Sequence, residues 1–118
     1  MTTTLYGIAS CDTVKKARAW LAERGVEHRF HDFRKDGVPA RQLEAWLREF
    51  GWEQVVNRRG TTWRRLDAAT QGAVQDAASA QALLLANPAA IKRPLVEWVD
   101  GRRTIGFNPG EWVLPGGQ

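Results

Sequence analysis

Cys11, the single cysteine of this sequence, is the residue best suited to nucleophilic chemistry. It follows a β-branched, apolar segment and precedes a run of helix-forming residues, so the sequence places it where a strand gives way to a helix. Unpaired backbone N–H groups and the positive end of the helix dipole favour an anion such as a thiolate at that place. We therefore expect a lowered pKa and a reactive thiol, and Lys15, one helical turn later, adds positive charge if it points back. The alternative interpretation is that Cys11 is a small buried apolar residue.

The segment Cys11-Asp12-Thr13-Val14 lacks the second cysteine of a C-x-x-C redox pair. With no resolving thiol in the chain, an oxidised intermediate at Cys11 must be released by an external thiol such as glutathione, through a mixed disulfide. Ser10, Asp12 and Thr13 are candidates to cap the helix and to hydrogen-bond the thiolate.

The elements around Cys11 form a predicted β-α-β unit. Thr2–Ile8 is expected to be a buried strand, and a helix from Asp12 or Thr13 to about Arg24 places Val14, Ala17 and Leu21 on one face, with Gly25 ending it. Val26–Phe33 is expected to be a second strand, parallel to the first through a right-handed crossover.

The middle of the chain is predicted to be helical. A helix starts at Pro39, with Leu43, Trp46, Leu47 and Phe50 at helical spacing, and ends before Gly51. The conformation of residues 52–63 stays open, apart from a loop at 58–62 that leads into helical material at 63–66. Residues 70–86 are expected to form two short helices broken near Ser79, and Asn87-Pro88 ends them.

The last part of the chain is predicted to be a β-hairpin. Leu95–Val99 and Arg103–Phe107 flank an Asp-Gly turn, and a short helical turn at 111–114 is expected to follow. The element order gives an α/β fold, a mixed sheet with helices packed on it, in one domain spanning residues 1–118.

Composition narrows the class of protein. The 43% hydrophobic and 25% charged residues are typical of a globular chain, and the single cysteine, the lack of a signal peptide and the lack of a long apolar run predict a cytoplasmic protein without a membrane partner. The net charge of +4 is compatible with a small anionic substrate, an acidic protein or nucleic acid. Dispersed tryptophans and short arginine pairs argue against nucleic acid, and His28 and His31, at odd spacing on one strand, argue against a metal site.

Three segments of the chain resemble the arsenate reductase (ArsC)/Spx family, and most closely its YffB-like branch. They are Leu5–Leu21 around the cysteine, the arginine loop Asn57–Trp63, and Ile91–Val96 with its Lys-Arg-Pro-Leu sequence. The resemblance covers nearly the whole chain. It implies a thioredoxin-like fold with an inserted helical region, and a cis-proline at Pro94 that faces the active cysteine.

The resemblance also implies site residues. In the arsenate reductases of this family the cysteine attacks an oxyanion held by three arginines, and glutathione with glutaredoxin completes the reduction. Arg93 matches the second arginine and Arg59, or else Arg58, matches the first, whereas Phe107 and Asn108 stand where the third is expected.

Cys11, Arg93 and Arg59 are therefore the expected catalytic residues, without a bound cofactor. The residues expected to bind substrate or glutathione are Asp12, Thr13, Lys15, Arg58 and Pro94.

Three functions follow as hypotheses. The first is a glutathione-dependent thiol reductase acting on a small anionic or thiol substrate, with glutathione as cosubstrate and glutaredoxin as a further partner. The second is an Spx-like transcriptional regulator that binds RNA polymerase, although Val14 replaces the second cysteine of that redox sensor. The third is a true arsenate reductase, which the missing third arginine disfavours.

Overall fold

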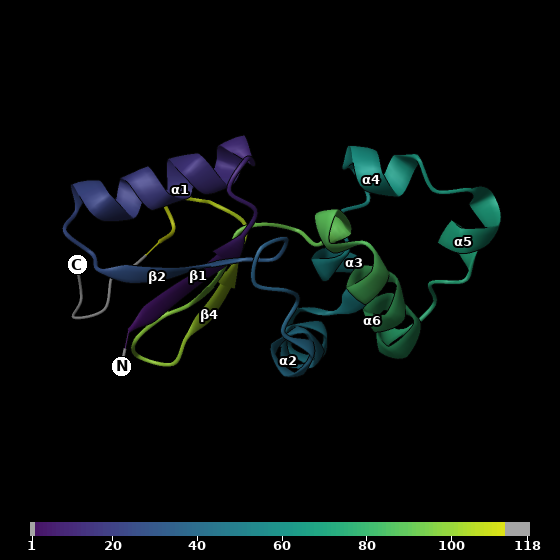
Figure 1. Ribbon diagram of the computed structural model, residues 1–118. Coiled ribbons are helices and arrows are strands. Elements are labelled where there is room, and N and C mark those ends of the chain that lie inside the picture. Colours follow the sequence, from purple (N-terminus) through teal and green to yellow (C-terminus); the bar gives the residue numbers. More distant parts are fainter. Residues whose placement is uncertain (1, 113–118) are drawn as a thin grey trace. The chain divides into compact units, whose positions relative to one another are not determined.

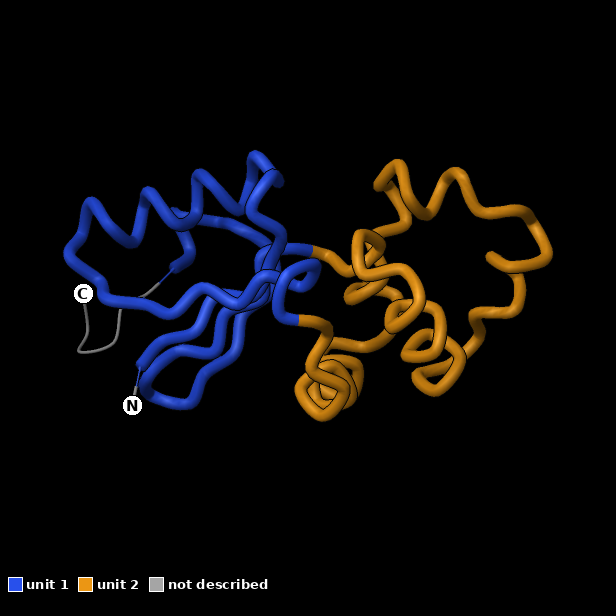
Figure 2. The backbone as a smooth tube through the Cα atoms, viewed as in Figure 1, with its two compact units in different colours: residues 1–36, 93–118 blue, residues 37–92 orange. Residues whose placement is uncertain are grey.

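A computed structural model describes residues 2–112, in two compact units. The first unit consists of the chain up to Asp36 and from Arg93 onward, and the second consists of residues 37–92 (Figure 2). The expectation of a single domain stays a prediction. Within the described residues, no helix has both the length and the apolar character needed to cross a bilayer.

The first unit is built on a four-stranded mixed sheet, as the element order predicts. Its strands are β1 (Thr3–Gly7), β2 (His28–Asp32), β3 (Leu95–Glu97) and β4 (Arg103–Ile105), in the order β2-β1-β3-β4 (Figure 1). β1 pairs with β2 in parallel, which confirms the predicted β-α-β unit, whereas β3 is antiparallel to both β1 and β4.

Helix α1 (Asp12–Glu23) covers one face of this sheet (Figure 1). It buries Val14, Ala17 and Leu21 against Leu5 and Val96, all of them at most 1% exposed. These are the three positions that the helical spacing predicts. Gly25, with φ 68°, lets the chain reverse after the helix toward β2, because a residue without Cβ adopts this backbone conformation at little cost.

An aromatic cluster closes the same core. The Trp112 ring lies 5.3 Å from Trp20, 5.1 Å from Trp98 and 4.9 Å from Phe107, each contact being edge to face. Trp98 and Trp112 are buried, so their role in this unit is packing, as predicted.

The hairpin is shorter than predicted, because pairing ends at Glu97 and Arg103. Trp98 N–H donates to Arg102 O at 2.8 Å, and Gly101 has φ 93°, a conformation that favours glycine. The Asp-Gly signal therefore predicts the turn correctly, although the strands are only three residues long.

The second unit is helical. Its elements are α2 (Ala40–Phe50), α3 (Trp52–Val55), α4 (Thr61–Arg64), α5 (Ala68–Gly72), α6 (Ala77–Ala86) and the 3-10 turn η1 (Pro88–Ala90). Helix α2 packs on α6 and buries Leu43, Trp46 and Leu47, which confirms the predicted helix from Pro39 to Gly51.

Two boundaries in this unit were predicted wrongly. The break in the alanine-rich segment lies at residues 73–76 rather than near Ser79. Ser79 lies inside α6, where it completes a capping box with Asp76: Ser79 N–H donates to Asp76 Oδ1 at 2.8 Å and Asp76 N–H donates to Ser79 Oγ at 3.1 Å. Helix α4 begins at Thr61, two residues before the predicted helical start at Trp63.

The predicted helical turn at 111–114 lies partly outside the described residues. Within them, the N–H groups of Glu111 and Trp112 both donate to Asn108 O, at 2.9 and 3.0 Å, so the chain turns here.

Gly7 permits the close approach of β1 and α1, and this generates a stability prediction. A Cβ at Gly7 would lie 2.6 Å from Cγ2 and 3.1 Å from Cγ1 of Val14, which is fully buried. We expect Gly7→Ala to lower the free energy of unfolding by about 1–3 kcal/mol, measured by urea denaturation. The double variant Gly7→Ala with Val14→Ala should show a smaller loss than the sum of the two single variants.

Gly72→Ala is the matched control, because nothing lies within 4 Å of a Cβ built at Gly72. Its effect should stay within about 0.5 kcal/mol. Equal effects at Gly7 and Gly72 would contradict the packing account.

Candidate active site

Cys11 occupies the N-cap position of α1, at the end of the turn that follows β1. Its own N–H donates to Ile8 O and its carbonyl accepts from Lys15 N–H, both at 3.0 Å, with φ −76° and ψ 124°. The expectation that Ser10, Asp12 or Thr13 caps the helix is therefore wrong: the cysteine takes that position itself. An atom at the end of an N-cap side chain faces the free N–H groups of the second and third helical residues, which here are Thr13 and Val14.

The thiol is half-buried and packs against the core of the first unit. Burial raises its pKa, but hydrogen bonding from the backbone N–H of Val14, hydrogen bonding and positive charge from Arg93, and the backbone N–H of Thr13 together outweigh burial. The net result is a pKa below the ordinary thiol value. Cys11 is thus a partly accessible thiol whose anion is stabilised, which is the environment of a nucleophile rather than of an inert core cysteine.

Arg93 reaches Cys11 because of the strand order. β1 runs toward Cys11 and β3 begins two residues after Arg93, and the two strands are antiparallel with Tyr6 opposite Leu95. The last residues of β1 and the first residues of β3 therefore lie side by side, at the same end of the two strands. The Arg93–Pro94 peptide bond is cis, as the resemblance implied, and Pro94 O accepts a hydrogen bond of 2.8 Å from Gly106 N–H.

Three further residues predicted to bind substrate or glutathione lie in the first turn of α1. Asp12, Thr13 and Lys15 are exposed at the start of α1, and of these only the Thr13 backbone is among the main influences on the Cys11 pKa. Lys15 was expected to stabilise the thiolate if its side chain pointed back, but it is not among the groups that lower the pKa of Cys11.

A packed aromatic residue, Phe107, stands where the third arginine is expected. Phe107 lies in the aromatic cluster, with ring centroids 4.9 Å from Trp112 and 6.5 Å from Trp20. Arg102 and Arg103, the neighbouring cations, are exposed on the hairpin and ion-paired with Asp100 and Glu97 at 2.8 and 3.2 Å.

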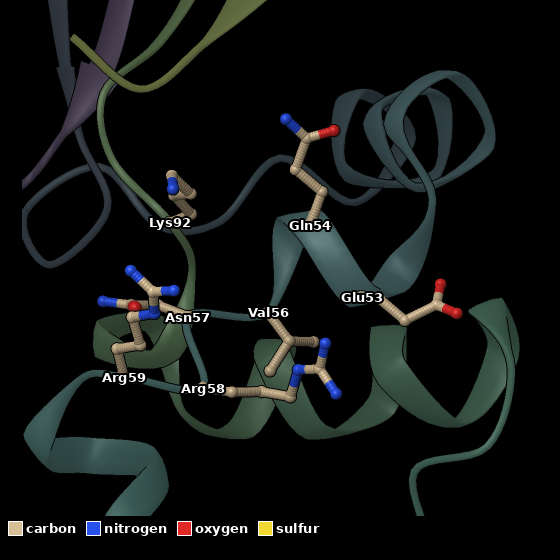
Figure 3. A pocket seen from close by; sticks show the side chains of 7 residues that line it. All are labelled: Glu53, Gln54, Val56, Asn57, Arg58, Arg59 and Lys92. Carbon is tan, nitrogen blue, oxygen red and sulfur yellow. The ribbon is translucent and has the colours of Figure 1, made fainter.

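Arg58 and Arg59 belong to the second unit, where they line a cavity of about 330 Å³ (Figure 3). Lys92, Asn57 and Gln54 line it with them, and none of these three is among the predicted site residues. Lys92 directly precedes Arg93 in the Lys-Arg-Pro-Leu segment, so Lys92 could have been predicted as a site residue from that segment.

The two histidines lie on one strand of the first unit. His28 and His31 occupy β2 at odd spacing, and the His31 ring lies 5.1 Å from that of Tyr6. Across residues 2–112, no group of three or more His, Cys, Asp and Glu side chains comes together in a way that could hold a metal ion.

The chain resembles known proteins along most of its length. A protein of Haemophilus influenzae, named only as an uncharacterized protein, is 46% identical over 109 residues, covering 92% of this chain and 94% of that protein. The solved structure of the YFFB protein is 49% identical, with a TM-score of 0.86 over 92% of this chain and 94% of that one. The global transcriptional regulator Spx of Streptococcus pyogenes is more distant, at 30% identity over 92% of this chain and 80% of its own length.

The family itself is settled by a direct match. The model of the ArsC family matches residues 6–113, a range that includes Cys11, the arginine loop and the Lys-Arg-Pro-Leu segment. This confirms the resemblance inferred from the motifs and agrees with the mixed four-stranded sheet and inserted helices described above. The chain belongs to the ArsC family.

Proposed function

We propose that this protein is a glutathione-dependent thiol oxidoreductase of the cytoplasm, with Cys11 as its nucleophile. The observation that carries the proposal is the environment of the thiol. Cys11 is a partly buried residue at the N-cap of α1, and backbone N–H groups and Arg93 lower its pKa against the effect of burial. A lowered pKa places more of the thiol in its nucleophilic form near neutral pH.

The proposed reaction exchanges thiols and disulfides. The Cys11 thiolate attacks one sulfur of a disulfide substrate R–S–S–R, the S–S bond breaks, and RS⁻ leaves and takes a proton from solvent. A glutathione thiolate then attacks the R sulfur of the Cys11 mixed disulfide, which restores the Cys11 thiolate and forms R–S–SG. A second glutathione, delivered directly or through glutaredoxin, reduces R–S–SG to RSH and leaves oxidised glutathione, so both electrons come from glutathione.

Arg93 has two roles in this proposal. Its charge stabilises the attacking thiolate, and its guanidinium offers paired N–H donors to an anionic group of the substrate. Arg59, or else Arg58, is assigned a second anionic contact on the strength of the family resemblance. Asp12, Thr13, Lys15 and Pro94 are assigned to the surface that substrate or glutathione contacts.

Arsenate reduction is less well supported. Phe107 fills the position of the third family arginine and is packed among tryptophans, so a cation that would hold arsenate is replaced by an apolar ring. Fewer charge-assisted hydrogen bonds to the oxyanion mean weaker binding.

A regulatory function is favoured by one observation, the 30% identity to the Spx regulator of Streptococcus pyogenes. Val14 stands where that type of sensor has its second cysteine, and its side chain is fully buried beneath Gly7. This chain therefore lacks the cysteine pair that such a redox sensor needs. Binding to RNA polymerase does not require that pair, and it is the second candidate function. Co-purification with polymerase tests it.

The pH dependence of Cys11 alkylation tests the electrostatics of the site. Because the thiolate is the reactive form and its pKa is lowered, the rate of reaction with iodoacetamide should reach half its maximum below the usual value of about 8.5. Arg93→Ala removes a charge and a hydrogen-bond donor, so its midpoint should move upward. Stopped-flow or quenched alkylation with mass detection measures both.

Arg102→Ala is the control for general charge effects, because Arg102 is an exposed arginine of the same unit that pairs with Asp100. Its midpoint should match that of the unaltered protein. A midpoint at the ordinary thiol value, or one indifferent to Arg93, would remove the basis of the proposal.

Reaction with oxidised glutathione tests the thiol chemistry itself. We expect one glutathione per chain by intact-protein mass spectrometry, since Cys11 is the single cysteine, and its release on adding reduced glutathione. Cys11→Ser should remain unmodified. If Cys11 forms no mixed disulfide, the thiol oxidoreductase function is wrong, and binding to RNA polymerase becomes the favoured function.

Steady-state kinetics of two variants can show which of the loop arginines, Arg58 or Arg59, contacts the substrate. If Arg59 makes the second anionic contact, Arg59→Gln should lower kcat/KM for an anionic disulfide about tenfold or more, whereas Arg58→Gln should change it less. The opposite ranking would assign the contact to Arg58. Equal and negligible effects would exclude both.

A further inference from the structure

The face of the sheet turned away from α1 holds a cavity of about 400 Å³ in the first unit, a volume in the range of small-molecule sites. Leu5 packs against α1, so the alternation of side chains along β1 puts Thr4 and Tyr6 on the opposite face. The parallel register places Arg29 beside Thr4 and His31 beside Tyr6. The residues that line this cavity, which we call the Arg29–Asp36 pocket, are Thr4, Tyr6, Arg29, Phe30, His31 and Asp36.

One cation and one carboxylate border this pocket without pairing with each other. Among the residues that the structure describes, no ion pair joins Arg29 or Asp36 to an oppositely charged side chain. On the same sheet Arg103 and Glu97 do pair, at 3.2 Å. Arg29 and Asp36 therefore lie too far apart for a direct ion pair, and a ligand that carries both charges could bridge them.

The backbone of β2 at Phe30 adds a hydrogen-bond donor and an acceptor, because β2 is an edge strand (Figure 1). Phe33 N–H donates to Gly7 O at 2.8 Å, so Arg29 and His31, which are in step with Phe33, direct their backbone groups toward β1. Phe30 is out of step with them and directs its N–H and C=O away from the sheet. In the described part of the chain neither group has a hydrogen-bond partner.

Asp36 is held beside Asp32, the next residue of β2 whose backbone points outward. Asp32 N–H donates to Asp36 Oδ2 at 3.0 Å, and Asp36 N–H donates to Asp32 O at 2.7 Å. The open backbone groups of Phe30 lie two residues earlier, about 6–7 Å along the strand. A carboxylate accepts several hydrogen bonds, so Asp36 can bind a ligand and still keep its bond to Asp32.

Aromatic rings provide the rest of the wall. The Tyr6 ring lies 5.1 Å from the His31 ring, and the Tyr6 hydroxyl donates to Glu97 Oε1 at 2.8 Å. Burial and the neighbouring Glu97 raise the pKa of Tyr6, so the ring stays neutral. A neutral ring whose hydroxyl already has a partner suits an apolar or aromatic group of a ligand.

We propose that the Arg29–Asp36 pocket binds an α-amino acid with an aromatic side chain. The carboxylate of the amino acid contacts Arg29 and the Phe30 N–H, and its ammonium group contacts Asp36 and the Phe30 C=O. Its side chain lies against the rings of Tyr6 and His31.

Titration of the full chain with L-phenylalanine, followed by two-dimensional amide NMR spectra, tests the proposal. The largest shifts should be saturable and fall at Thr4, residues 29–31 and Asp36. Arg29→Gln should raise Kd about tenfold, and Asp36→Asn should do the same, since each removes one charge-assisted contact. Unsaturable shifts, or an unchanged Kd in both variants, would overturn the proposal.

Both variants are expected to fold. Arg29 is exposed, and an asparagine at position 36 keeps a side-chain oxygen that can accept from Asp32 N–H. Arg34→Gln is the matched control, because it removes the same charge from an exposed position of the same segment, outside the pocket. Its Kd should equal that of the unaltered chain, and thermal unfolding should confirm that all variants are folded.

Three further probes identify the ligand chemistry. L-phenylalaninamide lacks the carboxylate and 3-phenylpropionate lacks the ammonium group, so each should bind about tenfold more weakly or worse. L-alanine keeps both charges without the ring and should also bind more weakly. If either analogue with a single charged group bound as tightly as L-phenylalanine, recognition of both charges would be wrong. Equally tight binding of L-alanine would overturn the preference for an aromatic side chain.

This pocket and the proposed function can fail independently of each other. The pocket lies on the face of the sheet turned away from α1, whereas Cys11 lies at the start of α1, and Arg29 is not among the main influences on the pKa of Cys11. Arg29→Gln should therefore weaken the binding of L-phenylalanine and leave the midpoint of Cys11 alkylation unchanged. A midpoint that moved together with Kd would overturn the assignment to a separate site.

Discussion

The antiparallel pairing of β1 with β3 is the constraint on which the chemistry of the first unit depends. With Tyr6 opposite Leu95, the residues that follow β1 and those that precede β3 emerge at one edge of the sheet. Cys11 and Arg93, 82 positions apart in the chain, become neighbours for this reason alone. The parallel pairing of β1 with β2 requires a crossover helix, and the start of that helix supplies the other groups that stabilise the thiolate.

The lowered pKa of Cys11 results from opposing effects. Packing against the core removes water from the sulfur, which disfavours the anion, while two backbone N–H groups and the Arg93 guanidinium favour it more strongly. Gly7 contributes indirectly, because the contact between β1 and Val14 leaves no room for a side chain and sets how closely the helix start approaches the strand. The same packing that stabilises the first unit therefore positions the Cys11 thiol.

The distribution of cations separates this chain from an oxyanion reductase with three arginines. Where a third arginine is expected, Phe107 joins the tryptophans and contributes apolar packing instead of charge. The remaining loop cations, with Lys92, border a pocket of the second unit that also contains two amides.

Short-range patterns in the sequence were enough to predict much of the local structure, and they pointed to Cys11 as the candidate reactive residue. Strand, helix and turn signals predicted the β-α-β unit, the buried face of α1 and the hairpin, because these depend on short-range periodicity and on glycine geometry. One cysteine without a second excluded an internal disulfide. Short-range patterns cannot encode contacts between distant segments. The folded chain shows that Arg93, which only the family resemblance had pointed to, lowers the pKa of Cys11, that Phe107 packs among tryptophans, and that Lys92 shares a pocket with the loop arginines. Each depends on contacts between distant segments, which strand pairing and core packing fix only in the folded chain.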